Sequence, residues 1–141
     1  MPKAKKYALD IDTEFDFDLI GISCHQSDYR LCWAINNQQG FKMQKAEKPY
    51  TIFEKKERVP TSHSFYEWED KENFRSFYLL KNKSNHKFLV PEQKHLDFFL
   101  IVKGVELNLD VLLTRLKEIN GILTAVLLDP NELKSSDNLI F

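Results

Sequence analysis

Two carboxylates and an imidazole lie within six positions of one another, at Glu92, His95 and Asp97. Side chains of these types perform general acid–base catalysis when a fold gathers them around a substrate. Cys24 or Cys32 could add a nucleophile, because a thiol becomes reactive beside a base. One hypothesis is therefore an enzyme, of a reaction class that no motif in the sequence specifies.

The same segment also has a structural interpretation. Pro91 lacks an amide donor and can end a strand, Glu92 can accept hydrogen bonds from turn amides, and Asp97 can fix the start of the next strand. An ionised Asp97 inside an apolar run needs a partner, for which Arg30 and Arg75 are the candidates. We favour this structural turn over a catalytic pair.

The segment Val90–Phe98 resembles the signature of the IPExxxVDY family, a bacterial family whose activity is not established. Three positions match the signature and three differ: Pro91, Glu92 and Asp97 are retained, whereas Val90, Leu96 and Phe98 replace its Ile, Val and Tyr. Residues 16–23, 28–36 and 133–141 are also similar to that family. The resemblance implies no particular activity, and the missing tyrosine hydroxyl at position 98 argues against a chemical role there.

Acidic residues alternate with other residues, most of them apolar, near the start of the chain, at Asp10, Asp12, Glu14, Asp16 and Asp18. On a strand these carboxylates would stand about 6.6 Å apart, too far for one calcium shell with ligands at about 2.3–2.6 Å. We therefore expect a solvated acidic face rather than a divalent-cation site.

The histidines and cysteines lack the spacing of a zinc site, in which ligands come in close pairs. The sequence has four histidines, none paired with another at ligand spacing: His25, His63, His86 and His95. We expect no metal and no cofactor. For Cys24 and Cys32 we expect buried thiols in a reducing compartment rather than a disulfide.

Two aromatic segments, Phe65–Trp68 and Phe74–Tyr78, raise the hypothesis of a base-stacking surface for RNA. Basic residues lie nearby, but acidic residues are interleaved with them and the formal net charge is −1. Such a chain has no general attraction for nucleic acid. Alternating aromatic residues in an antiparallel meander more commonly form core, so we expect core packing here and no nucleic-acid partner.

Length and composition are those of a single globular domain. The chain has 141 residues, of which 43% are hydrophobic and 29% are charged. The basic residues at the N-terminus are not followed by the apolar stretch of a signal peptide. The longest apolar run, Leu96–Val102, is broken by Asp97 and is too short to span a membrane. We expect a cytoplasmic protein without a membrane partner.

The first part of the chain is predicted to form a strand and two helical pieces. Lys6–Asp12 alternates as a half-buried strand does. Asp16 or Asp18 can cap a short helix that carries the apolar residues 19–22. A second helix is expected to begin at Ser27 or Asp28 and to end before Gly40. Two alternatives for these pieces stay open, one bent helix or a region that is partly strand.

The rest of the chain is predicted to be mainly strands. They are expected at Tyr50–Glu54, Ser64–Glu69, Ser76–Leu80, Lys87–Val90, Leu96–Val102 and Ile122–Leu128. The segment Leu96–Val102 is the most apolar and is expected to be central. An amphipathic helix, Leu109–Asn120, capped by Asn108 or Asp110, separates the last two strands, which gives a βαβ unit or a split one. Asp129 can then cap a last helical turn that begins with Pro130.

The sequence thus predicts one α+β domain over residues 1–141, with an antiparallel or mixed sheet of about six strands and two to three helices mainly on one face. The function that we expect is that of a small cytoplasmic, non-catalytic binding or interaction module, with a protein partner or self-association. Two alternatives stay open. One is an enzyme that uses Glu92, His95 and Asp97, and the other is an RNA-associated module that uses the aromatic sheet face.

Overall fold

The computed structural model describes residues 16–52, 60–84, 86–104 and 107–139. Its strands are β1 (Phe17–Cys24), β2 (Gln44–Lys45), β3 (Tyr50–Ile52), β4 (Thr61–His63), β5 (Phe65–Asp70), β6 (Arg75–Lys81), β7 (Lys83–Ser84), β8 (Lys87–Phe88), β9 (Phe98–Gly104) and β10 (Ile122–Leu128). Its helices are α1 (Asp28–Gln39) and α2 (Leu109–Lys117), with 3₁₀ turns η2 (Pro91–Gln93), η3 (Pro130–Glu132) and η4 (Ser136–Leu139).

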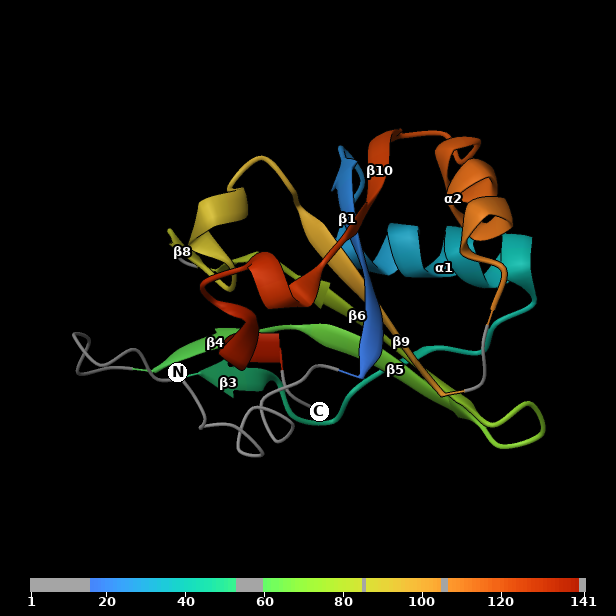
Figure 1. The fold of residues 1–141 in the computed structure, drawn as a ribbon, viewed down its shortest axis with the longest axis horizontal. Coiled ribbons are helices and arrows are strands. Elements are labelled where there is room, and N and C mark those ends of the chain that lie inside the picture. The colour runs from blue at the N-terminus through green and yellow to red at the C-terminus, as the bar shows by residue number, and fades with distance from the viewer. Residues whose placement is uncertain (1–15, 53–59, 85, 105–106, 140–141) are drawn as a thin grey trace, which may run out of the picture.

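Six strands form one antiparallel sheet in the order β10-β1-β9-β6-β5-β2. Two short hairpins, β3–β4 and β7–β8, lie outside it. Figure 1 shows α1 and α2 beside each other on one side of the sheet. The predicted α+β fold is confirmed, while the strand expected at Lys6–Asp12 lies outside the described residues.

Strand β9 lies in the interior of the sheet, as its apolar sequence predicts. Phe98, Leu100 and Val102 belong to the core cluster that includes the buried residues of α1 and α2. Phe99 and Ile101 belong to a second cluster on the other face. All five side chains are 2% exposed or less. A strand that is buried on both faces has no polar alternation, and the sheet needs a cover on each side.

The region of residues 17–24 corrects one prediction, because it forms strand β1 instead of a short helix capped by Asp16 or Asp18. Leu19 packs in one core cluster, and Ile20 and Ile22 pack in the other, which is the alternation of a strand. β1 is hydrogen-bonded to β9 on one side and to β10 on the other. Backbone pairing along both edges outweighs a local capping signal.

The two helices have the predicted caps and cover one face of the sheet. The Ser27 side chain accepts a hydrogen bond from the Arg30 amide, and the Asn108 side chain accepts one from the Val111 amide. Gly40 ends α1 in the left-handed conformation, with φ at 70°. The helices bury one stripe of side chains each: Leu31, Cys32 and Ile35 in α1, and Leu112 and Leu116 in α2.

The unit β9–α2–β10 is of the split type. Strand β1 lies between β9 and β10 and is antiparallel to both, so β9 and β10 are parallel to each other. β10 has the predicted bounds, Ile122–Leu128. Asp129 then accepts a hydrogen bond from the Asn131 amide, and Pro130 begins the short turn η3.

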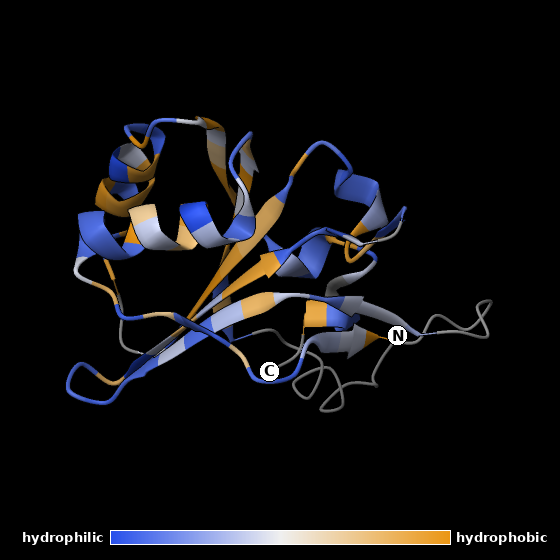
Figure 2. Cartoon of the chain, turned by 180° about the vertical axis from the view of Figure 1, so that it is seen from behind, coloured by the Kyte–Doolittle hydropathy of each residue, from blue (hydrophilic) through white to orange (hydrophobic). Residues whose placement is uncertain are grey.

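The other face of the sheet is covered by short segments. Leu89, Val90 and Leu96 come from the connection between β8 and β9, Ile52 comes from β3, and Leu139 comes from η4. Figure 2 shows apolar residues concentrated on the strands at the centre of the sheet and hydrophilic residues at the β5–β6 turn. Irregular segments can cover this face only if their buried backbone N–H and C=O groups have hydrogen-bond partners. The residues that supply those partners therefore stabilise this cover.

Aromatic residues of β5 and β6 contribute to the core, as predicted for these segments. Tyr66 and Phe77 are buried, whereas Phe74, in the turn between the two strands, is 74% exposed and departs from the prediction. The ring of Phe77 lies 4.2 Å from the ring of Phe41 and 5.6 Å from that of Trp68, measured between centroids. These three rings therefore pack against one another in the core cluster that also holds the buried residues of α1.

None of the helices in the described ranges has both the length and the apolar character needed to cross a membrane.

Candidate functional site

Residues 90–98, here called the signature corner, connect β8 to β9. Pro91 begins η2, where its missing amide hydrogen has no helical partner to lose. Val90 and Leu96 are buried on either side of this turn. Leu96 packs over Gly21 of β1, where a Cβ atom would lie 2.4 Å from Leu96 Cδ1. The corner is thus anchored by apolar contacts at both ends.

A buried amide, Asn82, holds the signature corner in shape. Its Nδ2 donates to the carbonyls of Gln93 at 3.0 Å and Leu96 at 2.8 Å, and its Oδ1 accepts from the Val90 amide at 2.9 Å. Its backbone amide donates to the Asp97 carbonyl at 2.9 Å. Both N–H groups and the oxygen of this buried side chain are therefore satisfied.

Asp97 attaches the corner to β1. Its Oδ2 accepts a hydrogen bond from the Cys24 amide at 2.8 Å, and its own amide donates to the Ile22 carbonyl at 2.8 Å. The pairing of β1 with β10 shifts register between Ser23 and Cys24. The carboxylate therefore accepts the hydrogen bond of an amide that lies at this irregular point of the strand. Asp97 is exposed, so water reaches the carboxylate.

The two arginines expected beside Asp97 have other partners, which corrects that prediction. Arg75 Nη2 lies 3.1 Å from Asp70 Oδ2 and closes the β5–β6 turn. Arg30 Nε donates to Gln26 Oε1 at 3.0 Å. The Cys24 backbone amide thus satisfies the Asp97 carboxylate in place of the expected arginine. The pairing of β1 with β9 brings this amide close to Asp97.

Glu92 connects the corner to the C-terminal part of the described chain. Its Oε2 accepts from the Ser135 amide and its Oε1 from the Ser135 hydroxyl, both at 2.8 Å. Burial raises the pKa of the Glu92 carboxyl, but hydrogen bonds from its own amide, from Ser135 and from the Lys134 amide together hold that pKa below its ordinary value. Nearby, Asn138 Nδ2 donates to the Leu89 carbonyl at 2.9 Å.

The two carboxylates of the corner serve different segments. Glu92 is held by Ser135 and Asp97 by the Cys24 amide, while His95 is exposed. A catalytic acid or base needs a proton or a substrate atom within reach of its oxygen atoms. The observed contacts instead use the oxygen atoms to anchor backbone, which stabilises the fold.

The two thiols are buried, and burial favours their protonated form. Burial raises the pKa of Cys24. Burial, assisted by the negative charge of Asp28, raises the pKa of Cys32 to about 11. The thiolate is the nucleophilic form, so neither cysteine has the character of a catalytic residue. Both are free cysteines.

In the part of the chain that the structure describes, no three His, Cys, Asp or Glu side chains are grouped as metal ligands. His25, His86 and His95 are exposed. His63 is buried, with Nδ1 at 3.0 Å from the Lys81 carbonyl. Burial lowers the pKa of His63, which favours the neutral ring in this position.

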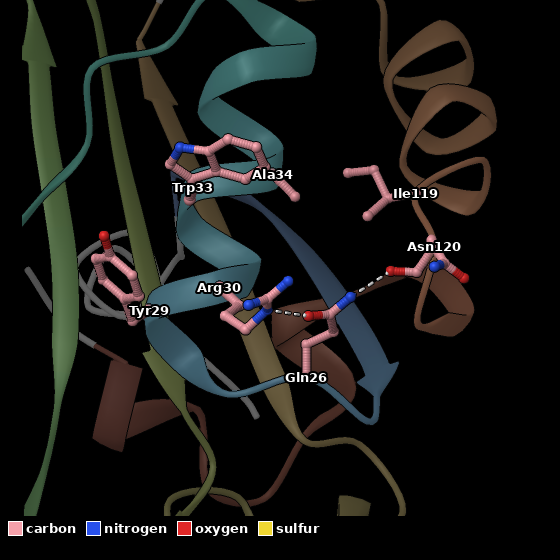
Figure 3. Close-up of a pocket in the computed structure, with 7 residues that line it drawn as sticks. All are labelled: Gln26, Tyr29, Arg30, Trp33, Ala34, Ile119 and Asn120. Atoms are coloured by element: carbon pink, nitrogen blue, oxygen red, sulfur yellow. Dashed lines mark hydrogen bonds between the residues drawn. The ribbon is translucent and has the colours of Figure 1, made fainter.

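A cavity of about 370 Å³ lies between α1 and the turn after α2 (Figure 3). We call it the α1 groove, and its lining residues are Gln26, Tyr29, Arg30, Trp33, Ala34, Ile119 and Asn120. Tyr29 and Trp33 are 67% and 60% exposed, which is unusual for aromatic side chains of this size. The groove is therefore a surface that combines aromatic side chains with one cation.

Hydrogen bonds fix the position of Arg30 in the α1 groove. Arg30 Nε donates to Gln26 Oε1 at 3.0 Å, and Gln26 Nε2 donates to the Asn120 carbonyl at 2.8 Å, as Figure 3 shows. Gln26 itself packs against Gly121, where a Cβ atom would lie 2.6 Å from Gln26 Cγ. Among the described residues, Nε carries the hydrogen bond of this guanidinium, so its two Nη groups can donate to an external anion.

Sequence reasoning named Arg30 only as a partner for Asp97 and missed the α1 groove. On a helix that begins at Asp28, positions 29, 30 and 33 point away from the buried positions 31, 32 and 35. Aromatic residues on the outward side of an amphipathic helix were the available signal. Ile119 and Asn120 come from a remote part of the chain, which only the fold brings to α1.

No protein-family model and no curated protein sequence matches this chain. In the signature corner, Asn82, Glu92 and Asp97 direct their polar atoms to the protein itself. In the α1 groove, aromatic faces and a guanidinium are open to a partner.

The first prediction concerns Asp97. Asp97→Ala removes the acceptor of the Cys24 amide and should lower the free energy of unfolding by about 1–2 kcal/mol. Asp97→Asn keeps an acceptor oxygen and should cost less. Glu72→Ala, at an exposed carboxylate in the β5–β6 turn, is the control and should change stability little. Urea unfolding measures all three; a more stable Asp97→Ala protein would instead indicate an active-site acid.

The second prediction concerns the pH dependence of Glu92. Because folding lowers the pKa of this carboxyl, its ionised form stabilises the fold above the ordinary pKa of about 4.5, and the contribution is lost as pH falls through the lower pKa of the folded state. Glu92→Gln should therefore be less stable than wild type at pH 7, and the difference should shrink below pH 4.5. Denaturant midpoints measured from pH 7 to pH 3 test this, and a gap that does not depend on pH contradicts it.

Proposed function

We propose that this protein is a non-catalytic protein-interaction module that binds its partner in the α1 groove. Trp, Tyr and Arg are the residue types that contribute most binding energy at protein interfaces. Trp33, Tyr29 and Arg30 occur together on the outward side of one helix, and both rings are more than half exposed. This combination is the observation that carries the proposal.

The chemistry of the groove favours a protein segment in which an Asp or Glu lies next to an apolar side chain. Arg30 is the charged residue among those that line the groove, and its Nη groups can bind a carboxylate as a fork. The neighbouring Asp28 is engaged by the Ser64 hydroxyl and the Tyr29 amide. Trp33 and Ile119 offer apolar surface beside the Arg30 guanidinium, so the partner needs both an acidic side chain and an apolar one.

An extended partner fits better than a small enclosed ligand. Tyr29 and Trp33 line the groove but are more than half exposed, so a small molecule enclosed by the cavity would leave much of both rings in water. A protein segment that crosses α1 covers both rings. Burial of aromatic surface together with a charge pair is a common source of specificity in such interfaces.

We further propose that the chain is a member of the bacterial IPExxxVDY family and works in the cytoplasm. The signature residues Pro91, Glu92 and Asp97 support the first point, and the two free cysteines support a reducing location. A structure of a family member that has the full Ile, Val and Tyr signature tests the relationship. Its Glu should bind the downstream segment and its Asp an amide of the first strand; other contacts would contradict it.

The third prediction tests the α1 groove with random 12-residue peptides displayed on phage and selected on the full chain. Selected peptides should combine an acidic residue with an aromatic or aliphatic one. For a synthetic selected peptide, Trp33→Ala should weaken binding at least about tenfold, because the ring supplies buried contact area. Arg30→Gln should weaken the acidic peptide and leave its Asn- or Gln-substituted form nearly unchanged. Fluorescence anisotropy gives the Kd values.

Phe74→Ala is the matched control, because Phe74 is 74% exposed and lies in the β5–β6 turn, outside the α1 groove. It should leave peptide binding unchanged. Selected peptides without acidic residues, or binding that survives Trp33→Ala, would refute the proposed site. Submicromolar binding of single-stranded RNA at physiological salt that Trp33→Ala abolishes would assign the groove to nucleic acid instead.

A further inference from the structure

Strand β10 lies at one edge of the main sheet. Among the described strands it pairs with β1 alone, so one side of its backbone is directed away from the sheet. The opposite edge, β2, is two residues long and consists of the exposed polar residues Gln44 and Lys45. β10 has seven residues. The two edges therefore differ in length and in polarity.

β10 lacks most features that protect an edge strand from pairing with another chain. Those features are charged side chains, prolines, bulges and short length. Residues 122–128 contain no charged residue and no proline, and the single irregularity is near Leu123. Leu123, Val126 and Leu127 are 62%, 38% and 51% exposed. An apolar, uncharged edge of this length is a surface on which another strand can pair.

We propose that a second copy of this chain pairs with β10 in antiparallel orientation, so that the two sheets join across a two-fold axis at Ala125. In this register Leu123 faces Leu127 of the second copy, and Thr124 faces Val126. All three exposed apolar side chains then lie in the interface. A two-fold pair uses one surface twice, so the strand itself supplies the complementary partner.

Charges beside the strand favour this orientation. Before β10, residues 115–121 contain the basic Arg115 and Lys117 and the acidic Glu118, which leaves one net positive charge. After β10, residues 129–135 contain the acidic Asp129 and Glu132 and the basic Lys134, which leaves one net negative charge. Antiparallel pairing brings the acidic end of one copy to the basic end of the other, whereas parallel pairing would bring like charges together. No charge within β10 opposes the contact.

The fourth prediction is that the purified full chain sediments as a dimer, at twice its mass of 16.7 kDa, in the presence of a thiol reductant. The double variant L123K/L127K should be monomeric, because it places like charges opposite each other across the axis. The double variant L123K/L127E should remain dimeric, because the same register then pairs opposite charges. Val111→Lys, on an exposed position of α2 (52%), is the control and should leave the dimer unchanged.

Circular dichroism checks that each variant is folded. Should L123K/L127K fail to fold, Val126→Lys alone tests the surface and should weaken dimerisation at least about tenfold. A wild-type chain that is monomeric at every concentration overturns the proposal, as does a dimer that persists in L123K/L127K. A monomeric L123K/L127E overturns the register. These outcomes do not depend on the α1 groove, since none of the substituted residues lines it.

Discussion

Strand β9 is apolar on both faces, and the rest of the fold provides the two covers that it requires. Phe98, Leu100 and Val102 pack against the helices, and Phe99 and Ile101 pack on the opposite face. One face is covered by helices, which satisfy their own backbone groups. The other is covered by short segments that cannot do so, so side chains must satisfy their polar groups. Asn82 meets part of this need, because its buried amide bonds the backbone of the connection between β8 and β9.

The signature corner fastens that second cover to the sheet. Asn82 shapes the corner from inside, Asp97 attaches it to β1, and Glu92 attaches it to the segment that ends in η4. Leu96 and Leu139 then bury their side chains in the same cluster. The carboxylates and the amide thus act as fixed connections between segments that are distant in sequence. Contacts of this kind cost free energy when they are broken, because a donor or acceptor loses its partner.

Among the described residues, the α1 groove and strand β10 both leave large apolar side chains exposed. The α1 groove ends at Asn120, and β10 begins at Ile122, so the two surfaces adjoin along the chain. Gly121 lies between them, and its lack of a side chain allows Gln26 to reach the Asn120 carbonyl. The groove offers aromatic rings and a guanidinium, while the strand offers backbone groups and aliphatic side chains. Their different chemistry suits different partners.

Local patterns in the sequence determined α1, the start of α2, the bounds of β10 and the central position of β9, because each depends on periodicity or on neighbouring residues. They did not determine that residues 17–24 form a strand, since that conformation depends on pairing with β9 and β10 at once. Nor did they give the partners of Asp97 and Glu92, or the fact that residues after α2 line the α1 groove together with residues of α1. The Cys24 amide, Ser135 and Ile119 reach these places only through tertiary structure, because hydrogen bonds and packing act between neighbours in space, whatever their separation along the chain.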